Sequence, residues 1–125
     1  MSEPTHKVSI RIDLGPGARI GPGKVKLLEE IARTGSISGA GRALRMSYRR
    51  AWELVEDLNR SLGVAVVTTA AGGSGGGGAT LTEAGKAVVA HYRAIEAATE
   101  AVAREYIAAL AELSESAHQP VPPPV

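Results

Sequence analysis

The sequence predicts a mainly α-helical fold with a small β-hairpin and one long helix at its C-terminal end. Three observations support this prediction. Alanine dominates the apolar residues of the 125-residue chain, and Phe is absent. Two short helical patterns follow each other closely between residues 36 and 62. A third pattern consists of two β-branched stretches that flank a run in which six of the seven residues 72–78 are glycine.

Composition excludes several classes of protein. The chain has no cysteine, so it forms neither disulfides nor thiolate metal sites. We expect no membrane span, because no apolar stretch reaches 18 residues. The first 13 residues lack the apolar core of a signal peptide. These features favour a cytoplasmic protein of one domain with no cofactor.

The N-terminal region predicts a strand, a loop and a helix. Apolar residues alternate with polar ones in residues 7–14, which predicts a strand with one buried face. The sequence does not indicate which part of the fold this strand packs against. Residues 15–23 contain Pro16, Pro22 and four glycines and indicate a loop. A helix begins near Pro22 or Gly23 and ends at Gly35. The expected buried positions are Val8, Ile10, Ile12 and Leu14 on the strand, and Val25, Leu28, Ile31 and Ala32 on the helix.

Residues 36–63 predict two helices joined by a tight turn. Ser36 is a suitable N-cap for a helix over about 37–44, and Ser47 caps a second helix over about 48–62 that ends at Gly63. The expected inner positions are Ile37, Ala40 and Leu44, then Trp52, Val55, Leu58, Asn59 and Leu62. A short helix followed so closely by a second one with a basic first turn is typical of a helix-turn-helix.

The charge of this region favours a polyanion. Five arginines and no acid lie between Ile31 and Trp52, although an arginine-rich solvated surface is the plain alternative. Arg49 and Arg50 can bond guanine or phosphate, and Glu53 can accept from cytosine N4. Tyr48 either packs against Trp52 or reaches a phosphate. The candidate DNA-binding residues of the two helices are Ser36, Ser38, Arg42, Arg45, Ser47, Tyr48, Arg49, Arg50 and Glu53.

The glycine-rich segment predicts a wing. Residues 64–69 and 79–82 have strand character on either side of the glycine run. Glycine permits a tight reversal and a close backbone approach to DNA, whereas a linker without contacts is the alternative. The candidate contacts in the wing are Gly73, Ser74, Gly75 and Gly76.

The last helical pattern predicts dimerisation. Thr82 caps a helix that reaches about Leu113, and apolar positions recur at spacings of four and three. Because a small domain cannot bury so long a seam, we expect a homodimer; a helix that folds back on its own domain, or breaks in two, is the alternative. The candidate dimerisation residues are Val88, Tyr92, Ile95, Thr99, Val102, Tyr106 and Leu113. The expected organisation is therefore a strand and winged helix-turn-helix over 1–81, a dimerisation helix over 82–114 and a disordered Pro-rich tail over 115–125.

Three motifs together resemble the N-terminal DNA-binding domain of the ModE family of molybdate-responsive bacterial regulators. They are "GSIS" at 35–38, "SYRRAWELVEDLN" at 47–59 and "GGSGGGGATLTEAG" at 72–85. The resemblance spans about residues 7–113. It implies a winged helix-turn-helix similar to that of LysR-type regulators, a homodimer and a palindromic promoter site. Family members continue into molybdate-binding modules, so we expect this stand-alone form to bind no molybdate by itself. Members also commonly carry a basic residue where this chain has Ser74, and the strand before it is often charged, whereas "VVTTAA" is neutral.

Enzyme motifs do not fit. The glycine run lacks the lysine of a phosphate-binding P-loop, and the three histidines are scattered. We therefore expect no catalytic or metal site. The expected function is a homodimeric, DNA-binding transcriptional regulator, linked to molybdate or metal-oxyanion metabolism by the resemblance alone. The alternatives are a winged-helix module that binds protein, and a non-specific DNA-binding protein.

Overall fold

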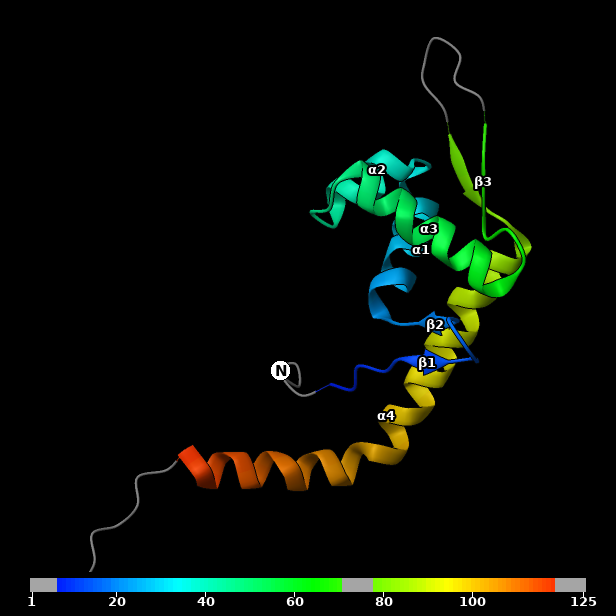
Figure 1. Cartoon of the computed structure of the whole chain (residues 1–125). Helices are drawn as coiled ribbons and strands as arrows, with labels where there is room; N and C mark the ends of the chain where they lie inside the picture. The colour runs from blue at the N-terminus through cyan, green and yellow to red at the C-terminus, as the bar shows by residue number, and fades with distance from the viewer. Residues whose placement is uncertain (1–6, 71–77, 119–125) are drawn as a thin grey trace, which may run out of the picture.

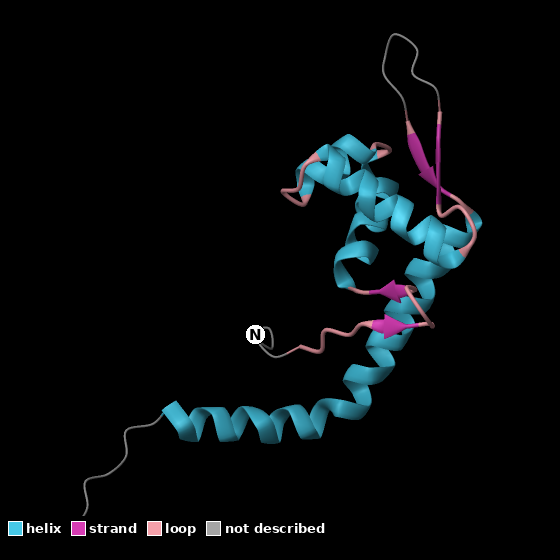
Figure 2. Cartoon of the chain, viewed as in Figure 1, coloured by secondary structure: helices cyan, strands magenta, loops and turns pink. Residues whose placement is uncertain are grey.

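The fold consists of three short helices, two small hairpins and one long helix. The computed structural model describes residues 7–70 and 78–118, and Figure 2 shows that the described chain is mainly helical. The mainly helical fold with a small wing is therefore confirmed. In chain order the elements are β1 (Ile12–Asp13), β2 (Arg19–Ile20), α1 (Pro22–Thr34), α2 (Ile37–Ala43), α3 (Tyr48–Leu62), β3 (Val67–Thr69), β4 (Ala79–Leu81) and α4 (Glu83–His118).

Local capping signals set the bounds of the first three helices. Pro22 lies in the first turn of α1, and Gly35 ends it in the left-handed conformation. The hydroxyl of Ser36 accepts the N–H of Gly39 at the start of α2. Gly63 ends α3 with φ 69°. The predicted bounds of α3 agree with the structure, and α2 ends one residue earlier than expected.

The core lies between α1, α2, α3 and the first half of α4. Val25, Leu28 and Ile31 are buried as predicted. The expectation for Ala32 was wrong, because its position faces solvent, whereas Leu27 is fully buried. Helix α1 is covered on more than one side, so its buried surface is wider than a single stripe. On α3 the fully buried positions are Ala51, Val55 and Leu58, and Trp52 is half-buried.

The N-terminal strand is shorter than predicted and forms a hairpin. Only Ile12 and Asp13 form β1, which pairs antiparallel with β2 in the register Ile12↔Ile20. Part of the predicted loop is therefore a strand, and Leu14 is exposed rather than buried. Figure 1 shows this hairpin lying against α4. The hydroxyl of Tyr92 on α4 donates to the carbonyl oxygen of Ile10 at 2.8 Å and helps to hold it there.

The second hairpin is the predicted wing. Strands β3 and β4 pair antiparallel, with Thr68 opposite Thr80, and the two hydroxyls lie 3.1 Å apart. The backbone N–H of Ala79 donates to the carbonyl oxygen of Gly35, which ties the wing to the end of α1. The wing residues Gly73, Ser74, Gly75 and Gly76 lie outside the described residues.

Helix α4 extends farther than predicted and has two different halves. It continues to His118, so residues 115–118, which we expected in a disordered tail, are helical. Figure 1 shows α4 running along the domain and then bending away from it. Tyr92 is only 1% exposed within its own domain and Val88 packs against the same core, so neither belongs to a free seam. None of the described helices is long and apolar enough to span a bilayer.

Candidate nucleic-acid interface

The N-terminal turn of α3 forms the centre of the candidate interface. The hydroxyl of Ser47 accepts the N–H of Arg50 at 3.0 Å and caps the helix. The same hydroxyl keeps its own proton to donate. No acid lies in this first turn, so the positive end of the helix dipole and two arginines occur together.

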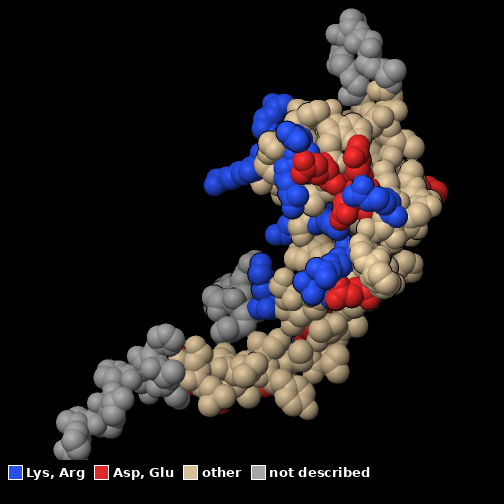
Figure 3. Space-filling model, viewed as in Figure 1, with Lys and Arg blue, Asp and Glu red and all other residues tan. Residues whose placement is uncertain are grey.

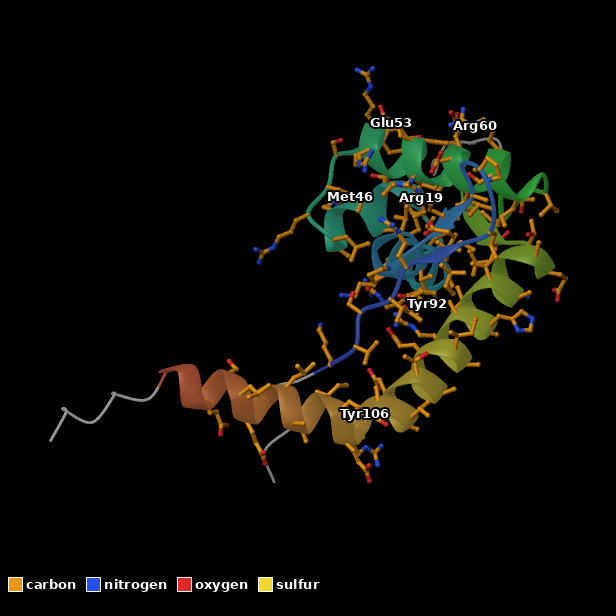
Figure 4. The ribbon with its side chains drawn as sticks, turned by 60° about the horizontal axis from the view of Figure 1, so that its bottom comes forward. Arg19, Met46, Glu53, Arg60, Tyr92 and Tyr106 are labelled. Carbon is orange, nitrogen blue, oxygen red and sulfur yellow. The ribbon has the colours of Figure 1, made fainter. Side chains whose placement is uncertain are left out.

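Arg49 and Arg50 both point to solvent. Their side chains are 90% and 59% exposed. Glu53 approaches both guanidinium groups, at 3.4 Å from Arg49 Nε and 3.6 Å from Arg50 Nη1. Arg49 and Arg50 are thus exposed, as a DNA-binding surface requires, but both of them share the carboxylate of Glu53. Figure 4 shows Glu53 and Arg60 at separate positions along α3.

The structure shows both the packing and the exposure of Tyr48. Tyr48 is 57% exposed. Its ring meets that of Trp52 edge-on, with centroids 6.2 Å apart. Tyr48 therefore packs against Trp52 and still presents its surface to solvent.

Helix α2 and the turn after it add further basic side chains. An Nη2 of Arg42 donates to the hydroxyl of Ser38 at 3.3 Å across one helical turn. Arg45 has φ 58°, a left-handed conformation in the tight turn. Ser36 uses its hydroxyl as the N-cap of α2. Figure 3 shows Lys and Arg side chains gathered around α2 and the start of α3.

Sequence reasoning missed Gly41, which brings the two helices together. A Cβ at Gly41 would lie 3.3 Å from the Met46 carbonyl oxygen and 3.4 Å from the Ala51 Cβ. The N–H of Met46 donates to the Gly41 carbonyl oxygen at 2.9 Å. The small residues at 39–41 were the available signal, because glycine and alanine at a helix crossing permit close packing.

One ion pair joins α1 to α3. Lys24 of α1 donates a hydrogen bond to the carboxylate of Asp57 on α3, and Arg60 of the same helix lies 3.4 Å from that carboxylate. The hydrogen bond from Lys24 lowers the pKa of Asp57 below its ordinary value of 3.8, although partial desolvation opposes this effect. Among the described residues, no group of three His, Asp or Glu side chains is arranged to hold a metal ion.

Comparisons with known proteins identify the domain. The sequence model of the family described as "Bacterial regulatory helix-turn-helix protein, lysR family" matches residues 23–86. The molybdenum-pterin-binding protein MopB of Rhodobacter capsulatus is 47% identical over 81 residues, which are 65% of this chain and 30% of MopB. The molybdenum transport protein ModE of Azotobacter vinelandii is 36% identical over 104 residues, 83% of this chain and 36% of ModE. These relatives confirm the resemblance to ModE-type proteins.

A solved structure supports the same fold. The crystal structure of the CbnR DNA-binding domain in complex with DNA matches with a TM-score of 0.53 and 25% identity, covering 70% of this chain and 95% of that one. The chain spans about a third of the length of the curated relatives it matches. The matched family consists of transcription regulators and not of enzymes. Because the match covers half of its residues and includes α1, α2, α3 and the wing strands, the chain belongs to the lysR family of bacterial regulatory helix-turn-helix proteins.

Proposed function

We propose that this chain is a transcriptional regulator that binds a palindromic promoter site as a homodimer in the bacterial cytoplasm. One observation carries the proposal: α3 presents its first turn, with Arg49 and Arg50, on an exposed end of the domain. A recognition helix enters the major groove with this end. Family membership and the similarity to a DNA-binding domain solved on DNA support the proposal.

The proposed contacts divide into two groups. Arg49, Arg50 and Glu53 face base edges, where arginine bonds guanine O6 and N7 in a bidentate manner. The other side chains position the protein on the phosphates and carry no sequence information themselves. This second group consists of Ser36, Ser38, Arg42, Arg45, Ser47 and Tyr48, together with the backbone of Gly73, Ser74, Gly75 and Gly76 in the wing.

The second half of α4 supports the homodimer. It exposes an apolar stripe after leaving its own domain, and an isolated helix gains little stability from such a surface in water. An apolar groove of about 230 Å³ between the β1–β2 hairpin and the first half of α4 is continuous with this stripe through Ile95. We propose that a second copy covers both surfaces. The exposed stripe consists of Val102, Tyr106, Leu110 and Leu113, and Ile95 in the first half of α4 connects it to the groove.

The relatives' names suggest the metabolic setting. MopB is named as a molybdenum-pterin-binding protein and ModE as a molybdenum transport protein. We propose that the genes under control concern molybdenum or a related metal oxyanion. We also expect these 125 residues by themselves to bind no molybdate tightly. Isothermal titration of the purified chain with molybdate checks this, and a stoichiometric submicromolar isotherm would contradict it.

The proposed DNA contacts are tested by paired arginine substitutions on α3. Arg49→Ala is compared with Arg60→Ala, because both arginines are exposed on α3 and each lies near a carboxylate on the same helix. Fluorescence anisotropy with the duplex upstream of the gene and a scrambled duplex, each at several salt concentrations, measures affinity and specificity. We expect Arg49→Ala or Arg50→Ala to cost about 1–3 kcal/mol of binding free energy and Arg60→Ala to have little effect.

The alternatives give different results in the same experiment. Equal affinity of the wild-type chain for both duplexes, with a steep dependence on salt, would indicate a non-specific DNA-binding protein. No binding to either duplex at low salt would contradict DNA binding altogether. In that case the arginine cluster would be assigned to a protein partner.

A further inference from the structure

Three charged side chains form an exposed triad on the outer surface of α3. Glu53 lies within ion-pair distance of Arg49 at 3.4 Å and of Arg50 at 3.6 Å, and its own side chain is 52% exposed. These spacings of three and four residues place all three groups on one side of the helix. Glu53 is the first acid that follows the basic stretch from residue 31 to 52.

Folding stability does not account for this triad. Ion pairs between side chains this exposed contribute little to the free energy of unfolding, because water and salt screen them. For binding to DNA the carboxylate is unfavourable in general. It repels phosphates and occupies two guanidinium groups that would otherwise contact them.

The hydrogen-bonding chemistry of Glu53 differs from that of its neighbours. An ionised carboxylate only accepts hydrogen bonds, whereas a guanidinium only donates them. In the major groove cytosine N4 and adenine N6 donate, while guanine O6 and N7 and thymine O4 accept. A carboxylate is therefore satisfied by the N4 amino group of cytosine, whereas the acceptor atoms O6 and N7 of guanine and O4 of thymine repel it.

We infer that Glu53 is a specificity-determining residue that prefers cytosine, through its N4 amino group, at the base it faces and rejects guanine or thymine at that base. When Glu53 accepts a hydrogen bond from the base, it gives up its ion pairs with Arg49 and Arg50. The two arginines can then bind guanine or phosphate. On other DNA the carboxylate keeps its two arginines and faces acceptor atoms of the base, which weakens binding. This inference rests on the proposed function, because it requires that α3 enters the major groove.

The position of Glu56 provides a matched control on the same helix. Glu56 is also exposed and follows Glu53 by three residues, which is about 4.5 Å farther from the helix start. Glu53→Gln and Glu56→Gln remove the same charge from α3 and keep the side-chain length. A general electrostatic effect would appear in both variants, whereas base discrimination would change in Glu53→Gln alone.

The experiment is selection of binding sites from a random duplex pool with the wild-type chain, Glu53→Gln and Glu56→Gln. Anisotropy on the enriched and scrambled duplexes follows, after circular dichroism has shown that all three proteins melt alike. We expect Glu53→Gln to bind scrambled duplex more tightly, with a salt slope steeper by about one. We also expect it to lose at least about fivefold of the discrimination at one base pair. Glu56→Gln should retain the wild-type motif.

Each other outcome has a definite meaning. If Glu53→Gln enriches the wild-type motif with equal discrimination, the role of Glu53 is wrong while the proposed regulator stands. If both variants relax the motif equally, the effect is general charge and the inference is overturned. If the wild-type chain enriches no motif at all, both the sequence-specific function and the inference fail.

Discussion

Gly85, at the start of α4, lies against the backbone at the base of the wing. A Cβ there would overlap the carbonyl oxygen of Val66, the residue before β3. Thr82 completes the junction: its hydroxyl donates to the Ala65 carbonyl oxygen at 2.6 Å and accepts the N–H of Gly85 at 3.0 Å. The N–H of Thr82 also donates to the Val66 carbonyl oxygen. The start of α4 and the first wing strand therefore form one connected unit.

We predict that Gly85→Ala destabilises the domain by about 1–3 kcal/mol, because the methyl group forces the wing base and α4 apart. Gly23→Ala is the control, since Gly23 also lies in the first turn of a helix but has nothing within 4 Å of its would-be Cβ. That substitution should be neutral or stabilise by up to about 1 kcal/mol. Urea unfolding followed by circular dichroism measures both. Equal midpoints for the two variants would show that the Val66 contact relaxes without cost.

The residues that sequence reasoning identified correctly act locally. Ser36 and Ser47 as N-caps, and Gly35 and Gly63 as helix ends, each depend on neighbours within four positions. Gly85 was visible in the motif, but its contact with Val66 joins residues 19 apart. Such a contact follows from packing, so no local pattern predicts it.

At the scale of elements, Arg93 attaches α4 to α1. It binds Glu29 of α1 through two nitrogens, at 2.6 and 3.0 Å, and Glu96 of α4 at 2.7 Å. The hydrogen bond from Arg93 lowers the pKa of Glu29 below its ordinary value of 4.5, while partial desolvation acts in the opposite direction. The first half of α4 is thus held to the helix-turn-helix by an ion pair as well as by apolar packing.

This contact predicts a dependence of stability on pH. Because the pKa of Glu29 is lower in the folded than in the unfolded chain, its contribution is present above the unfolded value and is lost as pH falls through the folded value. Both side chains are more than a third exposed, so we expect only about 0.5–1 kcal/mol at pH 7. Urea unfolding at pH 7 and pH 3 should show a smaller acid loss for Glu29→Gln than for wild type. Parallel losses would contradict the assignment.

The element that sequence reasoning placed least well is the N-terminal strand. The alternation of Val8, Ile10, Ile12 and Leu14 predicted an eight-residue strand, yet only Ile12 and Asp13 pair. They pair with Ile20 and Arg19, which lie beyond a turn rich in glycine and proline. Strand length is set by the partner, and the short reach of β2 leaves the rest of the alternation without one.

At the scale of the whole molecule, α4 divides into a part that belongs to the domain and a part that leaves it. Figure 4 shows Tyr92 beside the domain and Tyr106 on the part of α4 that leaves the domain, which we call the outer arm. The periodic seam predicted apolar positions along the entire helix but did not distinguish these environments. Tyr92 is buried, whereas Val102 and Tyr106 are 74% and 73% exposed. A period of 3.5 residues records which side of a helix is apolar, and only the fold shows what covers it.

The outer arm predicts that dimerisation and tight DNA binding are lost together. Val102→Glu with Tyr106→Glu places two charges in the exposed stripe, whereas Ala101→Glu with Ala108→Glu places two charges on exposed positions away from its centre. Sedimentation should give a monomer for the first pair and a dimer for the second, because a carboxylate buried in an apolar interface is unpaired.

Two linked recognition helices, one DNA turn of about 34 Å apart, gain avidity, so the monomer should bind a palindromic duplex at least about 100-fold more weakly. Its affinity for a half-site should stay unchanged, because α2 and α3 are remote from the substitutions. A dimer that persists in the first pair would move the interface away from the outer arm of α4.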